Sequence, residues 1–188
     1  MRRIGITGGI GSGKSVVSRL LRIMGYSVYD TDSEAKRLME SSLEVVQKLS
    51  ECFGRDIYHN GRLNRGLLSS RVFGESDKIV LLNSIVHPVV RFDFYRSLNE
   101  EICFVESAIL YESRFDELVD EVWTVTAPEE LRIGRVRQRS GLTEEEIKKR
   151  MAAQLSEEEK QRRAAHIIWN DGNVSVIHTV LSLLKSLE

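Results

Sequence analysis

Eight consecutive residues near the N-terminus carry the clearest chemical signal in the sequence. They match the pattern G-x-x-x-x-G-K-[ST] of phosphate-binding loops, and they are Gly8, Gly9, Ile10, Gly11, Ser12, Gly13, Lys14 and Ser15. Glycines let backbone N–H groups approach phosphate oxygens without an intervening Cβ, and the N-terminus of a following helix adds partial positive charge. We therefore expect this loop, together with Val16, to bind the phosphates of a nucleotide.

Two side chains at the end of the loop add the functional groups that phosphate binding requires. The Lys14 ammonium is expected to reach the β- and γ-phosphates, and the Ser15 hydroxyl to bind Mg²⁺. The loop follows a short apolar run, residues 3–7, and precedes residues 16–24, which have apolar side chains at helical spacing. The motif thus lies between a predicted strand and a predicted helix, where its mechanism needs it.

Two carboxylates follow a second apolar run, residues 27–29. They belong to Asp30 and Asp32. In phosphoryl transfer the protein positions the reactants and neutralises charge, while a carboxylate near the acceptor hydroxyl takes or steers its proton. Alternatively, Asp32 or Ser33 caps the next helix. The spacing alone supports both roles equally.

Three arginines recur at helical spacing further along the chain: Arg132, Arg135 and Arg139. One helix face carrying three guanidinium groups suits a triphosphate, although charged helix residues more often form a solvated face. Arg139, beside Gly141, is the strongest candidate for phosphate binding. Glu106 ends another apolar run and is a weaker candidate for supporting Mg²⁺ or water.

Composition limits the possible partners. The 188 residues include 27 basic and 28 acidic side chains, a net charge of -1, so no global field attracts nucleic acid. No apolar run approaches the roughly 20 residues that span a bilayer, and no leader pattern is present. Cys52 and Cys103 lack metal-ligand spacing and are expected to be reduced thiols. These features predict a soluble cytoplasmic protein that binds neither nucleic acid nor membrane.

Strand-like and helical patterns alternate along the chain. The apolar runs read as buried strands are residues 3–7, 27–29, 102–106, 122–125 and 167–169. This alternation predicts an α/β fold with a parallel sheet covered on both faces. Ligands bind beyond the carboxyl ends of such strands. The phosphate loop, the two aspartates and Glu106 all follow strand ends.

Two segments interrupt the alternation. Residues 33–100 are mostly helical and too long for a simple crossover, so we interpret them as an inserted substrate-binding subdomain. Within it, Asn60-Gly61 is a turn signal and Pro88 suits the first turn of a helix. Residues 129–156 resemble a lid: one helix to residue 139, a stop at Gly141, and a capping box at residues 143–146 opening a second helix. An amphipathic helix is expected at residues 174–187.

Several segments together resemble the dephospho-coenzyme A kinase family. They are residues 6–15, 28–32 with Ala35, 53–54, 60–65 ahead of Leu68 and 72–73, 87–88, 110–112, 135–139, Arg150 with Gln154, and 168–170. The phosphate loop is shared by many families, whereas the ordered set is far more specific. Two departures from the family pattern are Val16, where threonine is usual, and residues 107–110, where proline commonly precedes two leucines.

The resemblance implies a fold and a reaction. The fold is a three-layer P-loop kinase core with a five-stranded parallel sheet (residues 1–32 and 101–188), a helical acceptor-binding insertion (33–100) and a helical lid (129–156). The reaction is ATP-dependent phosphorylation of the ribose 3′-hydroxyl of dephospho-coenzyme A, with Mg²⁺ as cofactor. It completes coenzyme A biosynthesis.

The resemblance also implies roles for individual residues. Asp32 matches the family's proposed base, and Lys14 and Arg139 would act on the phosphates. The residues expected to bind the acceptor are Asp30, Asn64, Arg65 and His87. From the pattern alone, His87 is more typical of a helix start than of a catalytic site.

Three other functions compete with this one. Another small-molecule kinase on the same core would differ in its acceptor. A regulatory GTPase switch would be expected to carry an N-K-x-D motif, which the sequence lacks, and a nucleic-acid-binding NTPase would be expected to carry a basic stripe. Neither the residues nor the resemblance fixes an oligomeric state.

Overall fold

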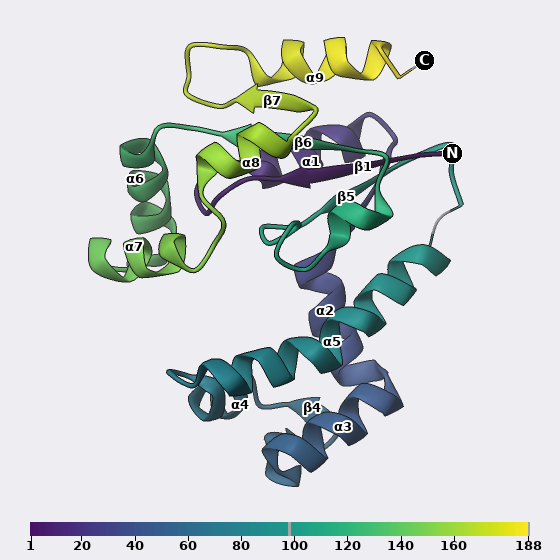
Figure 1. The fold of residues 1–188 in the computed structure, drawn as a ribbon, viewed down its shortest axis with the longest axis vertical. Helices are drawn as coiled ribbons and strands as arrows, with labels where there is room; N and C mark the ends of the chain where they lie inside the picture. Colours follow the sequence, from purple (N-terminus) through teal and green to yellow (C-terminus); the bar gives the residue numbers. More distant parts are fainter. Residues whose placement is uncertain (98, 188) are drawn as a thin grey trace. The chain divides into compact units, whose positions relative to one another are not determined.

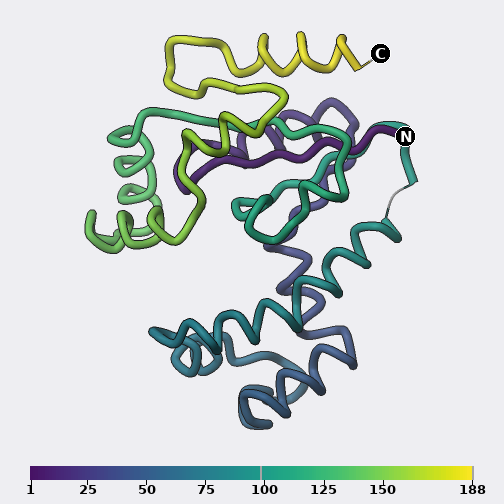
Figure 2. The backbone as a smooth tube through the Cα atoms, viewed as in Figure 1, coloured from purple at the N-terminus to yellow at the C-terminus, as the bar shows by residue number. Residues whose placement is uncertain are grey.

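The computed structural model describes residues 1–97 and 99–187, so Leu98 and Glu188 of the expected insertion and core lie outside the described residues. The chain forms two compact units, Met1–Asp30 with Asn99–Glu188, and Thr31–Leu98. The backbone leaves the first unit after its second strand and returns to it at residue 99 (Figure 2). The sequence analysis predicts an insertion over residues 33–100, and the second unit of the structure spans Thr31–Leu98.

A parallel sheet forms the centre of the first unit (Figure 1). Its strands are β1 (Arg2–Thr7), β2 (Ser27–Asp30), β5 (Ile102–Glu106), β6 (Glu121–Thr126) and β7 (His166–Trp169). They lie in the order β2-β5-β1-β6-β7, and every neighbouring pair is parallel. The five predicted strands and the parallel sheet are therefore confirmed.

Both faces of this sheet are covered, which gives the predicted three layers. Helices α1 (Lys14–Ile23) and α9 (Val176–Lys185) pack on the face carrying Ile4 and Ile6, in a core that also contains Trp123. On the other face lie α8 (Glu157–Arg163) and the segment that includes η2 (Phe115–Leu118). The rings of Phe104 and Trp123 pack edge to face, with 5.5 Å between their centroids. Aromatic pairs prefer this arrangement.

The predicted helices of residues 129–156 are present. Helix α6 (Glu129–Ser140) ends at Gly141, which adopts a left-handed conformation with φ 68°. Helix α7 (Glu144–Ala152) opens with the predicted capping box, in which Thr143 and Glu146 satisfy each other's backbone N–H groups. Sequence reasoning did not anticipate α8.

The second unit is mostly helical, as expected. It contains α2 (Thr31–Ser41), α3 (Leu43–Phe53), η1 (Arg55–Ile57), α4 (Arg65–Val72) and α5 (Ser76–Arg96). A short antiparallel hairpin joins β3 (Tyr58–His59) and β4 (Arg62–Leu63). Its turn is Asn60-Gly61, both with positive φ, as the turn signal predicted.

The prediction that Pro88 starts a helix is wrong. Pro88 lies inside α5, which begins at Ser76. The buried residues Val86, Val90 and Phe94 form one stripe that continues across the proline. Proline in a helix interior costs roughly 3 kcal/mol. Burial of this stripe offsets that cost, so the helix continues.

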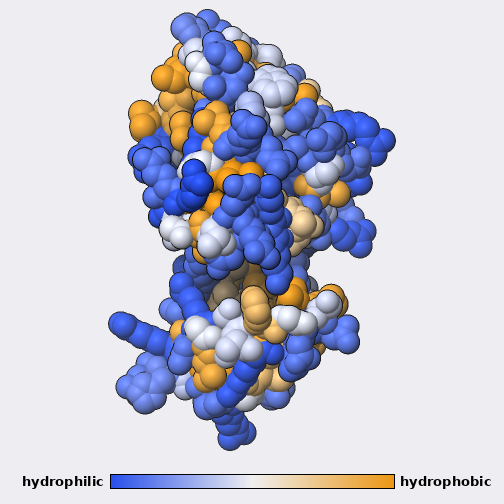
Figure 3. Space-filling model, turned by 90° about the vertical axis from the view of Figure 1, so that its left-hand side faces the viewer, coloured by the Kyte–Doolittle hydropathy of each residue, from blue (hydrophilic) through white to orange (hydrophobic). Residues whose placement is uncertain are grey.

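Hydrophilic residues dominate the face shown in Figure 3, with apolar residues scattered among them. No helix in the described part of the chain is long and apolar enough to cross a membrane. Cys52 is exposed and Cys103 is buried, and both are free thiols, as predicted.

Candidate functional site

The phosphate loop connects β1 to α1. Gly13, the residue before α1, has φ 99° and ψ 24°, and α1 has no acidic residue in its first turn. By contrast, α6, α7 and α8 each begin with two or three glutamates. The helix dipole places partial positive charge at each N-terminus. At α1 no acidic side chain of the first turn offsets that charge, so this end suits an anionic ligand.

Close packing fixes the identity of two loop glycines. A Cβ on Gly8 would lie 2.1 Å from the Val125 carbonyl oxygen, and one on Gly13 would lie 2.0 Å from Asn170 Nδ2. Both also have positive φ. Larger residues at these positions would push the loop away from the strand ends that hold it.

Lys14 lies across the loop. Its Nζ donates hydrogen bonds to the carbonyl oxygens of Gly8 and Gly9, at 2.8 and 3.2 Å. Ser15 and Val16 are exposed in the first turn of α1. The ammonium is therefore held against the loop, at the helix end that favours an anion.

Two side chains hold the carbonyl side of the loop. Asn170 Nδ2 donates to the Ser12 carbonyl at 2.8 Å, and Arg135 donates to the carbonyls of Gly11 and Ser12 at 3.4 and 3.5 Å. Arg135 is itself bonded to the Asn170 carbonyl at 2.9 Å. Since C=O and the next N–H point in opposite directions across a trans peptide, the Gly13 N–H points away from Asn170.

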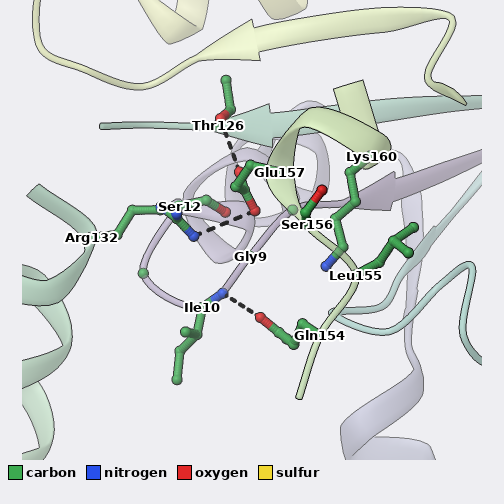
Figure 4. A network of polar contacts seen from close by, with 12 residues as sticks. Gly9, Ile10, Ser12, Thr126, Arg132, Gln154, Leu155, Ser156, Glu157 and Lys160 are labelled. Carbon is green, nitrogen blue, oxygen red and sulfur yellow. Dashed lines mark hydrogen bonds and ion pairs between the residues drawn. The ribbon is translucent and has the colours of Figure 1, made fainter. Parts of the chain in front are cut away.

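The three arginines of α6 have different environments. Arg132 is buried and pairs with Glu157 at 3.4 Å, and Glu157 accepts a hydrogen bond from Thr126 at 2.9 Å (Figure 4). Arg135 contacts the loop, and Arg139 is exposed at the end of the helix. The solvated-face interpretation is therefore wrong for Arg132 and Arg135. Sequence reasoning missed Glu157, because its partner is distant in sequence.

The strand-end carboxylates lie where expected. Asp30 pairs in register with Glu106 on the neighbouring strand, and Glu106 also pairs with Ile6, shortly before the loop. Asp32 is exposed in the first turn of α2. Helix α2 begins at Thr31, so both Asp32 and Ser33 lie within its first turn.

The candidate acceptor residues of the second unit have local partners. The Asn64 side chain caps α4 by accepting from the Leu67 N–H at 3.0 Å, and Arg65 pairs with Glu40 at 3.2 Å. His87 is half-buried within α5. Burial lowers its pKa, and the positive charge of Arg91 lowers it further. Acceptor binding by these residues stays a prediction.

The donor set fits Mg²⁺ held mainly by a nucleotide. The described residues contain no group of three or more His, Cys, Asp or Glu that could hold a metal ion. Mg²⁺ commonly takes one or two protein oxygens and completes its shell with phosphates and water. The exposed Ser15 hydroxyl, with the carboxylates of Asp30 and Glu106 on neighbouring strand ends, supplies oxygen ligands of that kind.

Comparison with known proteins identifies the family. The family model described as dephospho-CoA kinase matches residues 2–175. The chain belongs to the dephospho-CoA kinase family. It is 40% identical to the dephospho-CoA kinase of Bacteroides fragilis, over 98% of this chain and 92% of the relative.

Solved structures of related proteins support the same fold. The crystal structure of TT1252 from Thermus thermophilus has a TM-score of 0.84 at 36% identity, covering 100% of this chain and 98% of that one. Dephospho-CoA kinase from Campylobacter jejuni has a TM-score of 0.67 at 21% identity, covering 100% and 97%. The P-loop kinase fold expected from the resemblance is confirmed.

Proposed function

We propose that this protein transfers the γ-phosphoryl group of ATP to the ribose 3′-hydroxyl of dephospho-coenzyme A, giving coenzyme A and ADP. This is the last step of coenzyme A biosynthesis. The observation that carries the proposal is the family match over residues 2–175, which includes the phosphate loop and the segment around Asp32. Reduced cysteines and the two small-molecule substrates suit the cytoplasm.

The loop and Lys14 act on ATP. Backbone N–H groups at the start of α1 hold the phosphates, and the Lys14 ammonium neutralises charge that develops as the β–γ bridging P–O bond breaks. Ser15 would hold Mg²⁺, with Asp30 and Glu106 nearby at the strand ends. Bound Mg²⁺ supplies further neutralisation of the phosphate oxygens.

Asp32 acts on the acceptor. Its carboxylate orients the 3′-hydroxyl and takes its proton as the new bond from the 3′-oxygen to phosphorus forms, while ADP departs. Asp32 follows Asp30, the last residue of β2, by two positions in the chain, which supports this role. Asp30, Asn64, Arg65 and His87 are proposed to bind the rest of dephospho-coenzyme A.

Helices α6 and α7 act as the lid. Arg139 is exposed at the end of α6, beside the left-handed Gly141, so a movement of this hairpin would bring its guanidinium to the phosphates. Closure would also exclude water, which competes with the 3′-hydroxyl as acceptor.

The test is ATP turnover with Mg²⁺ and a panel of acceptors: dephospho-coenzyme A, nucleoside monophosphates, small alcohols, and none. Product masses are recorded for each. We expect a one-phosphate gain on dephospho-coenzyme A alone. Phosphorylation of a different acceptor would refute the substrate assignment, and hydrolysis without any modified acceptor would favour a nucleotide switch.

A further inference from the structure

One N–H group of the phosphate loop is bonded to a distant side chain. The Ile10 N–H donates to Gln154 Oε1 at 2.9 Å, and Gln154 lies just beyond α7 (Figure 4). The N–H groups of such a loop are its phosphate-binding groups. A loop N–H that has a protein acceptor instead anchors the loop and sets the direction of its neighbours.

The other end of the Gln154 side chain is also bonded. Its Nε2 donates to the Ala108 carbonyl at 3.4 Å, and Lys160 Nζ donates to the same carbonyl at 3.0 Å. Gln154 therefore bridges the phosphate loop and the segment that follows β5. A neutral amide suits this position because it offers an acceptor and a donor on one rigid group.

The Ala108 side of this bridge is rigidly held. Lys160 is completely buried, and its Nζ lies 3.7 Å from a Glu112 carboxylate oxygen. That carboxylate also accepts from the Leu155 N–H at 2.6 Å, next to Gln154 in the chain. Burial lowers the pKa of Lys160, which the Glu112 charge opposes. A buried ammonium needs these acceptors, so the segment around Ala108 has little freedom to move.

A second pair of residues holds the loop beside Ile10. A Cβ on Gly9 would lie 2.3 Å from Glu157 Oε1 and 2.4 Å from Arg132 Nη1, so this ion pair packs directly against Gly9. Gly9 is thus held by packing and Ile10 by a hydrogen bond through its N–H. The Arg132–Glu157 pair belongs to α6 and α8, and Gln154 belongs to the connection between α7 and α8.

We propose that Gln154 is a positioning residue for ATP: its amide holds the Ile10 N–H and the Ala108 carbonyl together, which keeps the remaining loop N–H groups directed at the phosphates. This role rests on the proposed ATP site and not on the identity of the acceptor. Gln154 is one of the residues that carry the family resemblance, and it has no role in the phosphoryl transfer proposed above. The positioning role gives it a function.

The test compares Gln154→Leu, which keeps the side-chain size and removes both hydrogen bonds, with the wild-type protein. Gln154→Asn keeps the amide on a shorter side chain. It serves as a second variant in case Gln154→Leu does not fold. Gln47→Leu is the matched control, because Gln47 is exposed on α3, where its side-chain amide donates to Glu51 at 2.9 Å. Calorimetry measures the dissociation constant of ATP without any acceptor.

Losing one or two neutral hydrogen bonds should weaken ATP binding about tenfold in Gln154→Leu, with a smaller loss in Gln154→Asn and none in Gln47→Leu. Hydrogen exchange should increase in residues 9–13 and stay unchanged in the sheet. The KM for dephospho-coenzyme A should not change.

Three results would overturn the proposal. ATP affinity within twofold of wild type in folded Gln154→Leu would show that the bridge does not position the loop. Tighter ATP binding would show that Gln154 competes with phosphate for the Ile10 N–H. Faster exchange throughout the first unit would show a general structural role. Because the calorimetry needs no acceptor, failure of the dephospho-coenzyme A assignment would leave this test intact.

Discussion

At the scale of single residues, the first prediction concerns Asp32, the proposed base for the acceptor hydroxyl. It lies in the first turn of α2, and its side chain is exposed. We expect Asp32→Asn to lower kcat at least about 100-fold, because general-base catalysis contributes roughly that much or more. The KM for ATP should stay near wild type.

The matched control is Asp77→Asn, since Asp77 is also exposed in the first turn of a helix. Both variants lose a similar favourable interaction with a helix dipole, so they should unfold at similar temperatures. Normal turnover by Asp32→Asn would assign the proton transfer to another group.

The half-buried His87 side chain should make the stability of the folded protein depend on pH. Burial, then the charge of Arg91, lowers its pKa below the ordinary 6.5, so the unfolded chain binds a proton at a higher pH than the folded chain does. Between pH 6.5 and that lowered pKa, acidification therefore favours unfolding. The His87 contribution is fully present above pH 6.5 and declines as the pH falls.

The measurement is urea unfolding from pH 7.5 to 5 for wild type, His87→Gln and the exposed-site control His178→Gln. The wild-type protein should lose more stability on acidification than His87→Gln, whereas His178→Gln should follow wild type. Parallel curves for wild type and His87→Gln would contradict the assigned pKa direction.

At the scale of elements, the turn from β1 into α1 depends on close contact as well as on backbone conformation. Gly13→Ala places a Cβ against Asn170 Nδ2, whereas Gly25→Ala, with φ 92°, meets nothing within 4 Å. Both substitutions incur the left-handed cost of roughly 1–2 kcal/mol. We expect only Gly13→Ala to lose ATP binding in a calorimetric titration. An equal effect of both substitutions on ATP affinity would attribute the glycine requirement to φ alone.

The sequence predicted those elements whose signals are local. Apolar runs located all five parallel strands, and the capping box at Thr143 and Glu146 located the start of α7. Pro88 was misjudged because a local helix-breaking signal competes with burial of a stripe that only the tertiary structure reveals. The same limit explains the missed partners of Arg132 and Arg135: Glu157 and Asn170 meet α6 and the loop only after folding. Asn170 could have been predicted as a site residue from the sequence, since it directly follows the last strand at its carboxyl end.

At the scale of the whole molecule, the division into two units predicts where each substrate acts. ATP at 100 times its dissociation constant should stabilise the folded protein by about 2.7 kcal/mol. Because the loop and its supports all belong to Met1–Asp30 and Asn99–Glu188, ATP should slow hydrogen exchange there, foremost in residues 8–16. Dephospho-coenzyme A should slow exchange within Thr31–Leu98, where Asn64, Arg65 and His87 lie.

Hydrogen exchange is measured peptide by peptide with each substrate alone, which separates the protection by ATP from the protection by dephospho-coenzyme A. ADP is the control, because it is also an adenine nucleotide. If dephospho-coenzyme A protected only the unit that contains the phosphate loop, the helical unit would not be the acceptor-binding part of the molecule. Asn64 and Arg65 would then keep only the roles that the structure already gives them, the cap of α4 and the ion pair with Glu40.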